Sequence, residues 1–362
     1  MKLSEKSQYL KKVGDLSCLY GIYDITYNSG KAKGVHAYEV KNGKQLKLTI
    51  FADRGMDIPL LEYKGYNVGF LSKSGLSSPF SYRYTPDGAD SFLRQFSAGF
   101  LTTCGITFSG AVCTDEGKQL PLHGRISNTI AENVYVCHEE ENDEVVLKLC
   151  GDVRESKIFE ENMVLHRQMK VYTESNRIKI KDIVENQGFQ KQPVVMIYHV
   201  NFGYPLLDTG AKLYFSASEV EPQTEFAKQG LDLYNIIEEP EDCREEQCYY
   251  HYGQKEPKNS FAMIYNEKLG IAVVVKYDAE QCPIMCEWKS MQAGDYALGL
   301  EPTTNGTKGR ASIKEAGKLK ELEGQESCEF SFEFLFLDNA EEIEKWRSLC
   351  KENEAVIRHG NC

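Results

Sequence analysis

The chain of 362 residues has no long apolar run and no excess of positive charge. No segment approaches the roughly 20 consecutive apolar residues that a membrane-spanning helix needs. Lysine and arginine number 42 against 54 aspartates and glutamates, which gives a formal net charge of −12. Nucleic acids and anionic membranes both favour a basic protein surface. We therefore expect neither of them as a partner.

The N-terminal segment MKLSEKSQYLKK lacks the apolar core of a secretion signal. We accordingly expect a cytoplasmic, reducing location, in which the twelve cysteines are mostly free thiols packed as small apolar groups. Two close pairs, Cys243/Cys248 and Cys282/Cys286, lack the two-residue spacing that is usual for a zinc knuckle. We expect no metal and no other cofactor.

The dominant hydrophobic period is two, which is typical of half-buried strands. It is clearest at the C-terminal side, where four apolar residues, Phe330, Phe332, Phe334 and Phe336, alternate with Glu329, Ser331, Glu333 and Leu335. Turn residues such as Asn42-Gly43 separate many short strands, and few helical segments lie between them. This pattern predicts an all-β protein, either a sandwich or a barrel.

The chain also lacks a long linker, a repeat and a low-complexity tract, so we expect one domain over residues 1–362, with an N-terminal extension of about 1–33. One helix is predicted at about 340–352, with Asn339 as its cap and Ile343, Trp346 and Leu349 on one face. The acidic segment 238–247 is expected to be a solvated loop.

Five segments carry residues suited to binding or catalysis. A histidine followed by glycine and arginine (His123, Gly124, Arg125) allows a close approach of backbone or ligand at the glycine. An apolar segment ends in His199 and Asn201, and another ends in Glu301 before Pro302. A buried glutamate is costly unless it is paired or used. The remaining candidates are Arg94, and Trp288 with Lys289, where an indole beside a charge suits sugar stacking.

The order of these segments resembles the galactose mutarotase-like superfamily of aldose 1-epimerases and hexose-phosphate mutarotases. The matching segments are PLHGR, HVNFGYPLLD and GLEPTT, and DRGMDI with EWK resembles a bacterial aldose-epimerase-like branch of the DUF4432 type. The resemblance runs from about Gly34 to Phe336 and implies a large twisted β-sandwich. It departs from the family at Asn201, where the family usually has tyrosine, and His251 is the candidate for the place of an acidic substrate ligand.

This resemblance implies an isomerase that interconverts the anomers of a small-molecule carbohydrate, with Glu301 as general base and His199 as general acid. The reaction needs Glu301 as carboxylate and His199 protonated, so we expect a neighbouring carboxylate or the sugar hydroxyls to hold the proton on His199. The other candidates, Arg94, His123, Arg125, Asn201, His251, Trp288 and Lys289, are expected to bind substrate. Either arginine suits a phosphate or carboxylate on the sugar.

Two alternatives stay open. One is a non-catalytic carbohydrate-binding protein on the same fold, because fold does not determine function. The other is a different sugar epimerase, isomerase or lyase, with a metal held by His123, His199 and His251. Asp53 and Arg54 are expected to be mainly structural, because adjacent strand residues point to opposite faces; the alternative is that Arg54 lines the cleft. The sequence does not determine the oligomeric state.

Overall fold

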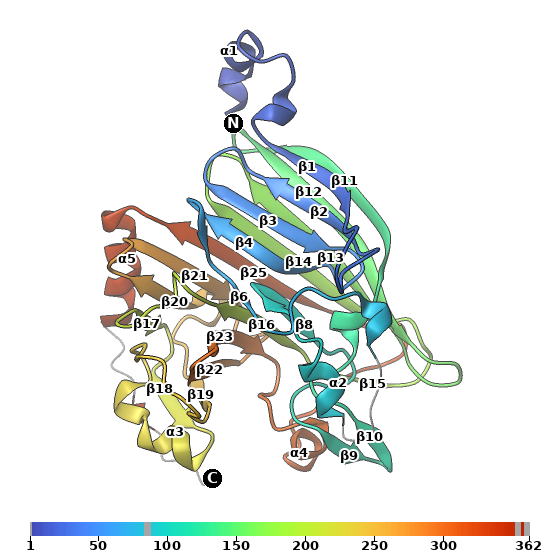
Figure 1. The fold of residues 1–362 in the computed structure, drawn as a ribbon. Helices are drawn as coiled ribbons and strands as arrows, with labels where there is room; N and C mark the ends of the chain where they lie inside the picture. Colours follow the sequence, from blue (N-terminus) through green and yellow to red (C-terminus); the bar gives the residue numbers. More distant parts are fainter. Residues whose placement is uncertain (1, 83–87, 352–355, 358–362) are drawn as a thin grey trace.

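Two large sheets form most of the molecule in the computed structural model, which describes residues 2–82, 88–351 and 356–357 (Figure 1). The larger sheet has twelve strands, in the order β1-β2-β3-β4-β8-β16-β23-β22-β19-β18-β26 with β5 beside β4, and all its pairs except β18–β26 are antiparallel. Its strands are β1 (Gly21–Thr26), β2 (His36–Lys41), β3 (Leu46–Phe51), β4 (Asp57–Tyr63), β5 (Tyr66–Asn67), β8 (Leu101–Cys104), β16 (Ile197–Phe202), β18 (Glu219–Pro222), β19 (Gln247–Tyr252), β22 (Ile284–Gln292), β23 (Asp295–Thr303) and β26 (Val356–Ile357).

The second sheet has eight antiparallel strands in the order β11-β12-β13-β14-β25-β21-β20-β17. Its strands are β11 (Ala131–Glu141), β12 (Glu144–Ser156), β13 (Asn162–Tyr172), β14 (Arg177–Asn186), β17 (Lys212–Phe215), β20 (Ser260–Asn266), β21 (Ile271–Tyr277) and β25 (Ser327–Leu337). Three two-stranded sheets complete the strands: β6 (Phe70–Leu71) with β7 (Ala98–Gly99), β9 (Cys113–Asp115) with β10 (Lys118–Leu120), and β15 (Gln192–Val194) with β24 (Lys320–Leu322).

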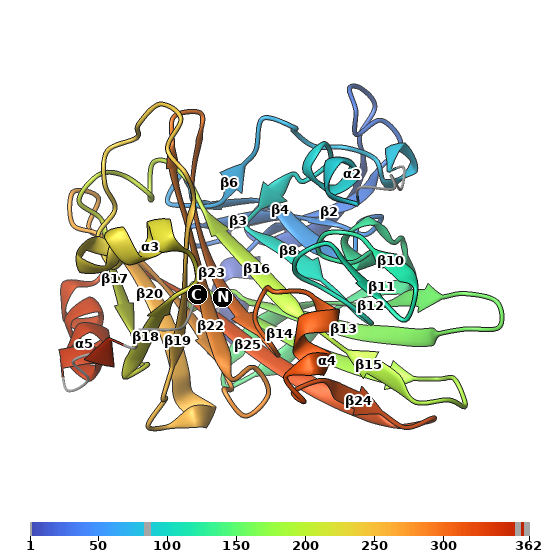
Figure 2. The same ribbon diagram turned by 90° about the horizontal axis from the view of Figure 1, so that it is seen from below.

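The two large sheets enclose the main apolar core, which draws on both of them. Leu48 and Val200 come from the twelve-stranded sheet, and Met169 and Phe334 from the eight-stranded sheet. The four alternating phenylalanines of β25 all belong to this core. The predicted all-β sandwich is therefore confirmed, and Figure 2 shows its layers from below.

Helices are short and peripheral in the described residues. The α-helices are α1 (Lys6–Leu10), α2 (Ala89–Leu93), α3 (Glu225–Gln229), α4 (Arg310–Glu315) and α5 (Ala340–Lys351). The 3-10 helices are η1 (Leu3–Glu5), η2 (Leu16–Cys18), η3 (Pro79–Ser81), η4 (Ile126–Asn128), η5 (Leu231–Leu233) and η6 (Pro257–Asn259). None of the described helices has both the length and the apolar character required to span a bilayer. Before residue 34, β1 pairs with β2, so the expected N-terminal extension contributes a strand to the sheet.

Helix α5 begins where the sequence predicts, after Asn339, whose side chain accepts hydrogen bonds from the backbone N–H groups of Glu341 and Glu342 (2.9 and 3.1 Å). It packs beside the edge of the eight-stranded sheet (Figures 1 and 2). Ile343 and Trp346 contact that sheet as predicted, but the third contact is Cys350, and Leu349 is exposed. Position 350 lies seven residues after 343, which is two helical turns, so it continues the buried stripe better than position 349 does.

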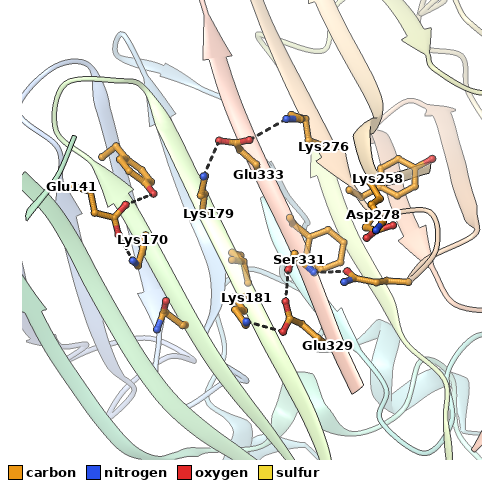
Figure 3. A pocket seen from close by; sticks show the side chains of 16 residues that line it. Glu141, Lys170, Lys179, Lys181, Lys258, Lys276, Asp278, Glu329, Ser331 and Glu333 are labelled. Atoms are coloured by element: carbon orange, nitrogen blue, oxygen red, sulfur yellow. Dashed lines mark hydrogen bonds and ion pairs between the residues drawn. The ribbon is translucent and has the colours of Figure 1, made fainter. Parts of the chain in front are cut away.

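The outer face of the eight-stranded sheet carries a hollow of about 550 Å³ lined by charged side chains (Figure 3). Lys181 pairs with Glu329 at 2.7 Å, and Lys276 pairs with Glu333 at 3.3 Å. Lys170 also forms an ion pair, with Glu141. Because the charges neutralise one another, this hollow has the character of a solvated sheet face, and it lies on the other sheet from the predicted catalytic residues.

Candidate active site

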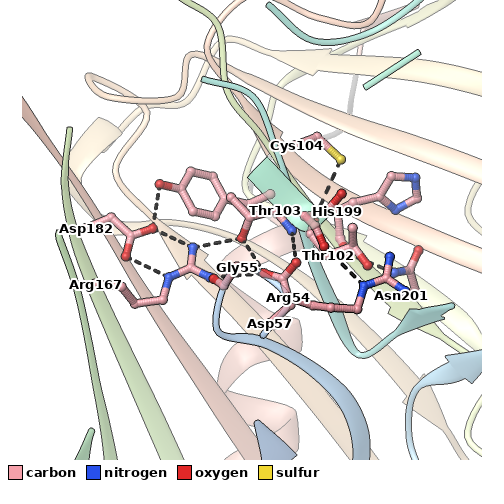
Figure 4. A network of polar contacts seen from close by, with 12 residues as sticks. Arg54, Gly55, Asp57, Thr102, Thr103, Cys104, Arg167, Asp182, His199 and Asn201 are labelled. Carbon is pink, nitrogen blue, oxygen red and sulfur yellow. Dashed lines mark hydrogen bonds and ion pairs between the residues drawn. The ribbon is translucent and has the colours of Figure 1, made fainter. Parts of the chain in front are cut away.

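His199 lies on β16, a central strand of the twelve-stranded sheet between β8 and β23. Successive strand residues point to opposite faces, so Tyr198 faces the core and His199 faces away from it. The Tyr198 hydroxyl donates to Asp182 (2.9 Å), which also accepts from Arg167 (2.7 Å). Figure 4 shows this network, in which Arg167 also contacts Asp57 at 3.0 Å. The network ties β16 to both sheets and holds the strand that carries His199.

Glu301 reaches His199 from the neighbouring strand β23, although the two residues are distant in sequence. Its Oε1 lies 3.2 Å from His199 Nε2, without hydrogen-bond geometry. Gly299 makes room for this carboxylate, because a Cβ added there would lie 2.2 Å from Glu301 Oε1. A side chain two residues before the glutamate would therefore force the carboxylate to shift.

Aromatic rings surround this pair. Trp288, on the next strand β22, is half-buried, and its ring centroid is 5.5 Å from that of His199. His123 lies 5.6 Å from His199 by the same measure, and Phe96 lies 5.1 Å from it. Phe92 of α2 stacks on Phe96 and contacts His123. The rings cover His199 and Glu301, which are 4% and 1% exposed.

The histidine-glycine motif places His123 through a sharp turn. His123 and Gly124 both have positive φ values, 58° and 79°. A Cβ on residue 124 would lie 2.3 Å from the carbonyl oxygen of Gly105, so only glycine fits there. The close approach that the sequence predicts at Gly124 is thus made by the backbone of another loop.

Four buried polar atoms in this cluster have no hydrogen-bond partner among the described residues: His123 Nδ1, His199 Nδ1, Asn201 Oδ1 and Glu301 Oε1. Buried polar groups are normally paired, because an unpaired one costs about 1–3 kcal/mol. Four of them at one place indicate a site whose polar groups meet a ligand. Asn201 contributes directly, since its amide also donates to the His199 carbonyl (2.9 Å) and is thereby oriented.

Burial shifts the pKa values of His199, His123 and Glu301 in the directions that favour their neutral forms. It lowers the pKa of His199 to about 3, with a further contribution from His123. It lowers the pKa of His123 to about 4. It raises the pKa of Glu301 well above its usual value, and the charge of Glu246 adds to the rise. The expected protonated His199 is therefore not the favoured form of the ligand-free site, because Glu301 holds the proton instead.

Comparison with known proteins identifies the family. A family model described as a domain of unknown function, DUF4432, matches residues 32–335. The chain belongs to this family. No curated protein matches it.

Solved structures share the fold of this DUF4432 chain. A Klebsiella pneumoniae protein named as a putative aldose 1-epimerase has a TM-score of 0.88 at 22% identity, over 98% of this chain and 93% of that one. A galactose mutarotase-like protein from Clostridium acetobutylicum has a TM-score of 0.61 at 15% identity, over 88% and 99%. Galactose 1-epimerase from Lactobacillus acidophilus has a TM-score of 0.56 at 11% identity, over 88% and 99%. The resemblance inferred from the sequence is thereby confirmed at the level of the fold.

The DUF4432 site brings together His123, His199, Asn201, Trp288 and Glu301, but it does not include His251 or Lys289. On β22, Glu287 and Lys289 point to the opposite face from Trp288. His251 Nε2 contacts Glu287 (2.8 Å), and the Lys289 ammonium donates to Glu238 (2.6 Å) and to the Leu233 carbonyl (2.7 Å). A metal shared by His123, His199 and His251 is therefore not supported, because the three rings do not face one place.

Arg94 and Arg125, which the sequence predicts to bind substrate, contact other groups. The Arg94 side chain is about three-quarters exposed and pairs with Asp90 on the same helical segment (2.7 Å). It lies between Phe92 and Phe96, which face the site, so its own direction differs from theirs. The Arg125 guanidinium lies over the Phe108 ring, 4.9 Å from the centroid.

Asp53 and Arg54 have structural partners, as predicted. Asp53 accepts from the His36 backbone N–H (2.9 Å). Arg54 is 7% exposed and donates to the Ser127 carbonyl, the Ser77 hydroxyl and the Asn128 side chain, among other neutral acceptors. It thereby joins three loops. A small hollow beside it includes Thr102, which pairs with His199 across β8 and β16 and therefore points to the same face, so Arg54 borders the face of the sheet that carries His199.

Sequence reasoning missed the aromatic cover and the role of Gly299. Phe92 and Phe96 are four residues apart, which is the spacing of one helical face, although α2 ends at Leu93 and Phe96 follows it. That spacing was available in the sequence as a signal. Nothing in the sequence shows that this face packs onto a distant histidine.

Proposed function

We propose that this chain is an aldose 1-epimerase-like isomerase that acts on a small-molecule carbohydrate, with residues 1–362 working as one domain. The observation that carries the proposal is the buried His199–Glu301 pair, 3.2 Å apart and left without hydrogen-bond partners beside Asn201 and His123. The names of the structural neighbours agree with this reaction class. A histidine and a carboxylate are suited to general acid–base catalysis, which is typically worth 10²–10⁴-fold.

Ring opening needs one proton removed and one supplied. The Glu301 carboxylate takes the proton of the C1 hydroxyl, and the O–H electron pair forms the C1=O1 double bond. The C1–O5 bond breaks, its electron pair moves to the ring oxygen, and the protonated His199 supplies the proton there. Rotation about C1–C2 and reversal of these steps closes the other anomer, and the pair regains its starting protonation.

Burial of His199 and Glu301 favours the protonation states that these residues have after ring opening. Ring opening leaves Glu301 protonated and His199 neutral, which is the form that burial favours through the raised pKa of Glu301 and the lowered pKa of His199. The charged and neutral forms of the pair hold the same single proton, so sugar hydroxyls that donate to Glu301 can restore the charged form without uptake of a proton from solvent. The carboxylate and the imidazole lie on adjacent strands, within reach of two oxygens bonded to the same carbon.

Substrate access requires movement of the aromatic cover. Phe96 packs against His199, and the reacting groups are at most 4% exposed. A sugar ring replaces these contacts by stacking on Trp288, the half-buried indole of the site. Phe92 and Phe96 are therefore the residues that a bound sugar displaces.

The decisive experiment measures anomer exchange by NMR over a panel of neutral, phosphorylated and acidic sugars. We expect accelerated exchange with at least one sugar, and a loss of about 100-fold or more in Glu301→Gln and in His199→Asn. The double variant should be little worse than either single one, because acid and base act as a unit. Circular dichroism and melting curves serve as the folding control.

Two outcomes contradict the proposal. Sugar binding without exchange above buffer for the whole panel favours a non-catalytic carbohydrate-binding protein. Exchange that survives Glu301→Gln unchanged leaves an enzyme but removes Glu301 as its base.

A further inference from the structure

The acidic segment 238–247 is an irregular and mostly exposed loop, as its composition predicts, but two of its residues are anchored beside the candidate site. The Trp288 indole N–H donates to Glu246 (2.7 Å), and the Lys289 ammonium donates to Glu238 (2.6 Å). Trp288 and Lys289 are neighbours on β22, so they hold the two ends of the segment from opposite faces of the strand. Lys289, expected to bind substrate, thus helps to fix the position of Glu246.

Two of the carboxylates in this segment, Glu238 and Glu241, have cationic partners, and Glu246 is among those that have none in the described residues. Arg244 pairs with Glu238 (2.7 Å) and with Glu241 (3.0 Å). Glu246 has no cationic partner within the described part of the chain, and its carboxylate contacts the edge of the indole that forms one wall of the site. Glu246 therefore presents a negative charge next to the wall against which a substrate would lie.

Among the described residues, two arginines near the cluster are engaged by other groups: Arg54 donates to neutral acceptors that include the Ser127 carbonyl and the Ser77 hydroxyl, and Arg125 lies over the Phe108 ring. Burial keeps His199 and His123 neutral, since it lowers the pKa of both. Arg94 pairs with Asp90 on the surface, and Lys289 points to the other face of β22. Over residues 2–82, 88–351 and 356–357, no lysine or arginine pairs with Glu301. An anionic group on a ligand that stacks on Trp288 would thus meet the Glu246 carboxylate.

We propose that Glu246 sets the charge preference of this site, so that it accepts uncharged or amino sugars and rejects sugars that carry a phosphate or a carboxylate. The inference rests on the proposed function and names its substrate class. Glu246 is exposed, but its carboxylate is held at the edge of Trp288, where it repels an anionic group on a stacked ligand, and such repulsion is a source of specificity.

The test compares Glu246→Gln with wild type on matched sugar pairs: glucose with glucose 6-phosphate, and galactose with galacturonic acid. Gln keeps an acceptor for the indole N–H and removes only the charge. We expect the neutral-to-anionic ratio of kcat/KM to exceed about tenfold in wild type and to fall by about tenfold in Glu246→Gln. Glu245→Gln, the same change at the neighbouring residue, which is also exposed but does not contact Trp288, should leave the ratio within about twofold.

Wild-type preference for the anionic member of each pair would overturn the proposal, as would a ratio that is the same in Glu246→Gln. Glu246→Ala also removes the acceptor for Trp288. If that variant changes the neutral-to-anionic ratio but Glu246→Gln does not, Glu246 only positions the indole and the charge proposal fails.

A second readout does not depend on turnover. The carboxyl stretch of Glu301, taken from infrared difference spectra against Glu301→Gln, reports its titration in the ligand-free protein. Removing a nearby negative charge lowers the pKa of a carboxyl group, so the midpoint should move to lower pH in Glu246→Gln and move less in Glu245→Gln. An unmoved midpoint refutes the action of Glu246 on the site. Absence of exchange with every sugar refutes the proposed function separately.

Discussion

Two histidine–glutamate pairs bridge neighbouring strands of the same sheet and differ in how completely they are satisfied. His251 and Glu287 join β19 and β22 on the core face, with a contact of 2.8 Å, and His251 stacks on Phe215. His199 and Glu301 join β16 and β23 on the other face at 3.2 Å, without hydrogen-bond geometry. Both pairs are buried.

This difference indicates that the His251–Glu287 pair stabilises the fold and that the His199–Glu301 pair is available to a ligand. A buried charge or polar group is tolerated when its partners are supplied internally. In the core-face pair His251 Nε2 contacts Glu287 Oε2, and one atom, Glu287 Oε1, has no partner among the described residues. The site-face pair retains unpaired atoms on both residues and on Asn201 next to it, a cost that folding does not recover.

The largest expected contrast is in catalysis. Glu301→Gln should reduce anomer exchange by about 100-fold or more, because it removes the base. Glu287→Gln should leave kcat/KM within about threefold, since its side chain faces the core. Both are measured by NMR exchange with the best sugar of the panel. Equal losses of exchange rate in the two variants would contradict the assignment of catalysis to one face of the sheet and of stability to the other.

Stability should show the reverse contrast. His251→Ala should lower the free energy of unfolding by about 3–5 kcal/mol, because it leaves the Glu287 carboxylate buried without its partner. His199→Ala should cost much less, since the histidine it removes is itself incompletely satisfied. Urea denaturation gives both values. A larger loss for His199→Ala than for His251→Ala would contradict the assignment of the core-face pair to the fold.

The pH dependence of stability should distinguish the two members of the site-face pair. The pKa of Glu301 is raised by burial, so the folded form binds its proton more tightly and stability falls as pH rises above about 4.3 toward the folded pKa. The pKa of His199 is lowered to about 3, so stability falls as pH drops from about 6.5 toward 3.

Glu301→Gln should therefore gain about 1–3 kcal/mol over wild type at pH 8 and little at pH 4. His199→Asn should gain most near pH 4 and little at pH 8. Melting curves across this range are the measurement, and Glu245→Gln is the control, with a difference that stays nearly constant. A gain that does not vary with pH in either variant would show that these groups do not titrate as described.

The smallest expected effect concerns the position of the carboxylate. Gly299→Ala places a Cβ 2.2 Å from Glu301 Oε1, so the carboxylate must shift. We expect kcat to fall by about tenfold, because small misplacement of a reacting group costs one to two orders of magnitude. Gly14→Ala, at a position with open space around it, is the matched control and should leave kcat unchanged. An unchanged kcat in Gly299→Ala would remove the argument for this glycine.

The sequence by itself determined the sandwich and the order of the candidate residues. The phenylalanines of β25 alternate because a sheet buries one face, and that period is visible in any strand. Glu301, His199 and His123 were found because short segments around them resemble a family. The predicted cap at Asn339 depends on neighbouring residues only, which is why it was found correctly.

Only the tertiary structure decided which face each residue occupies and what it contacts there. Trp288 and Lys289 are adjacent in sequence, yet one borders the site and the other supports the segment that carries Glu246. A shift of one strand position reverses the face, and the sequence does not mark which face carries the site. Which of His199 and Glu301 holds the proton likewise depends on burial by Phe96 and Trp288. These rings pack beside His199 only after distant strands have paired.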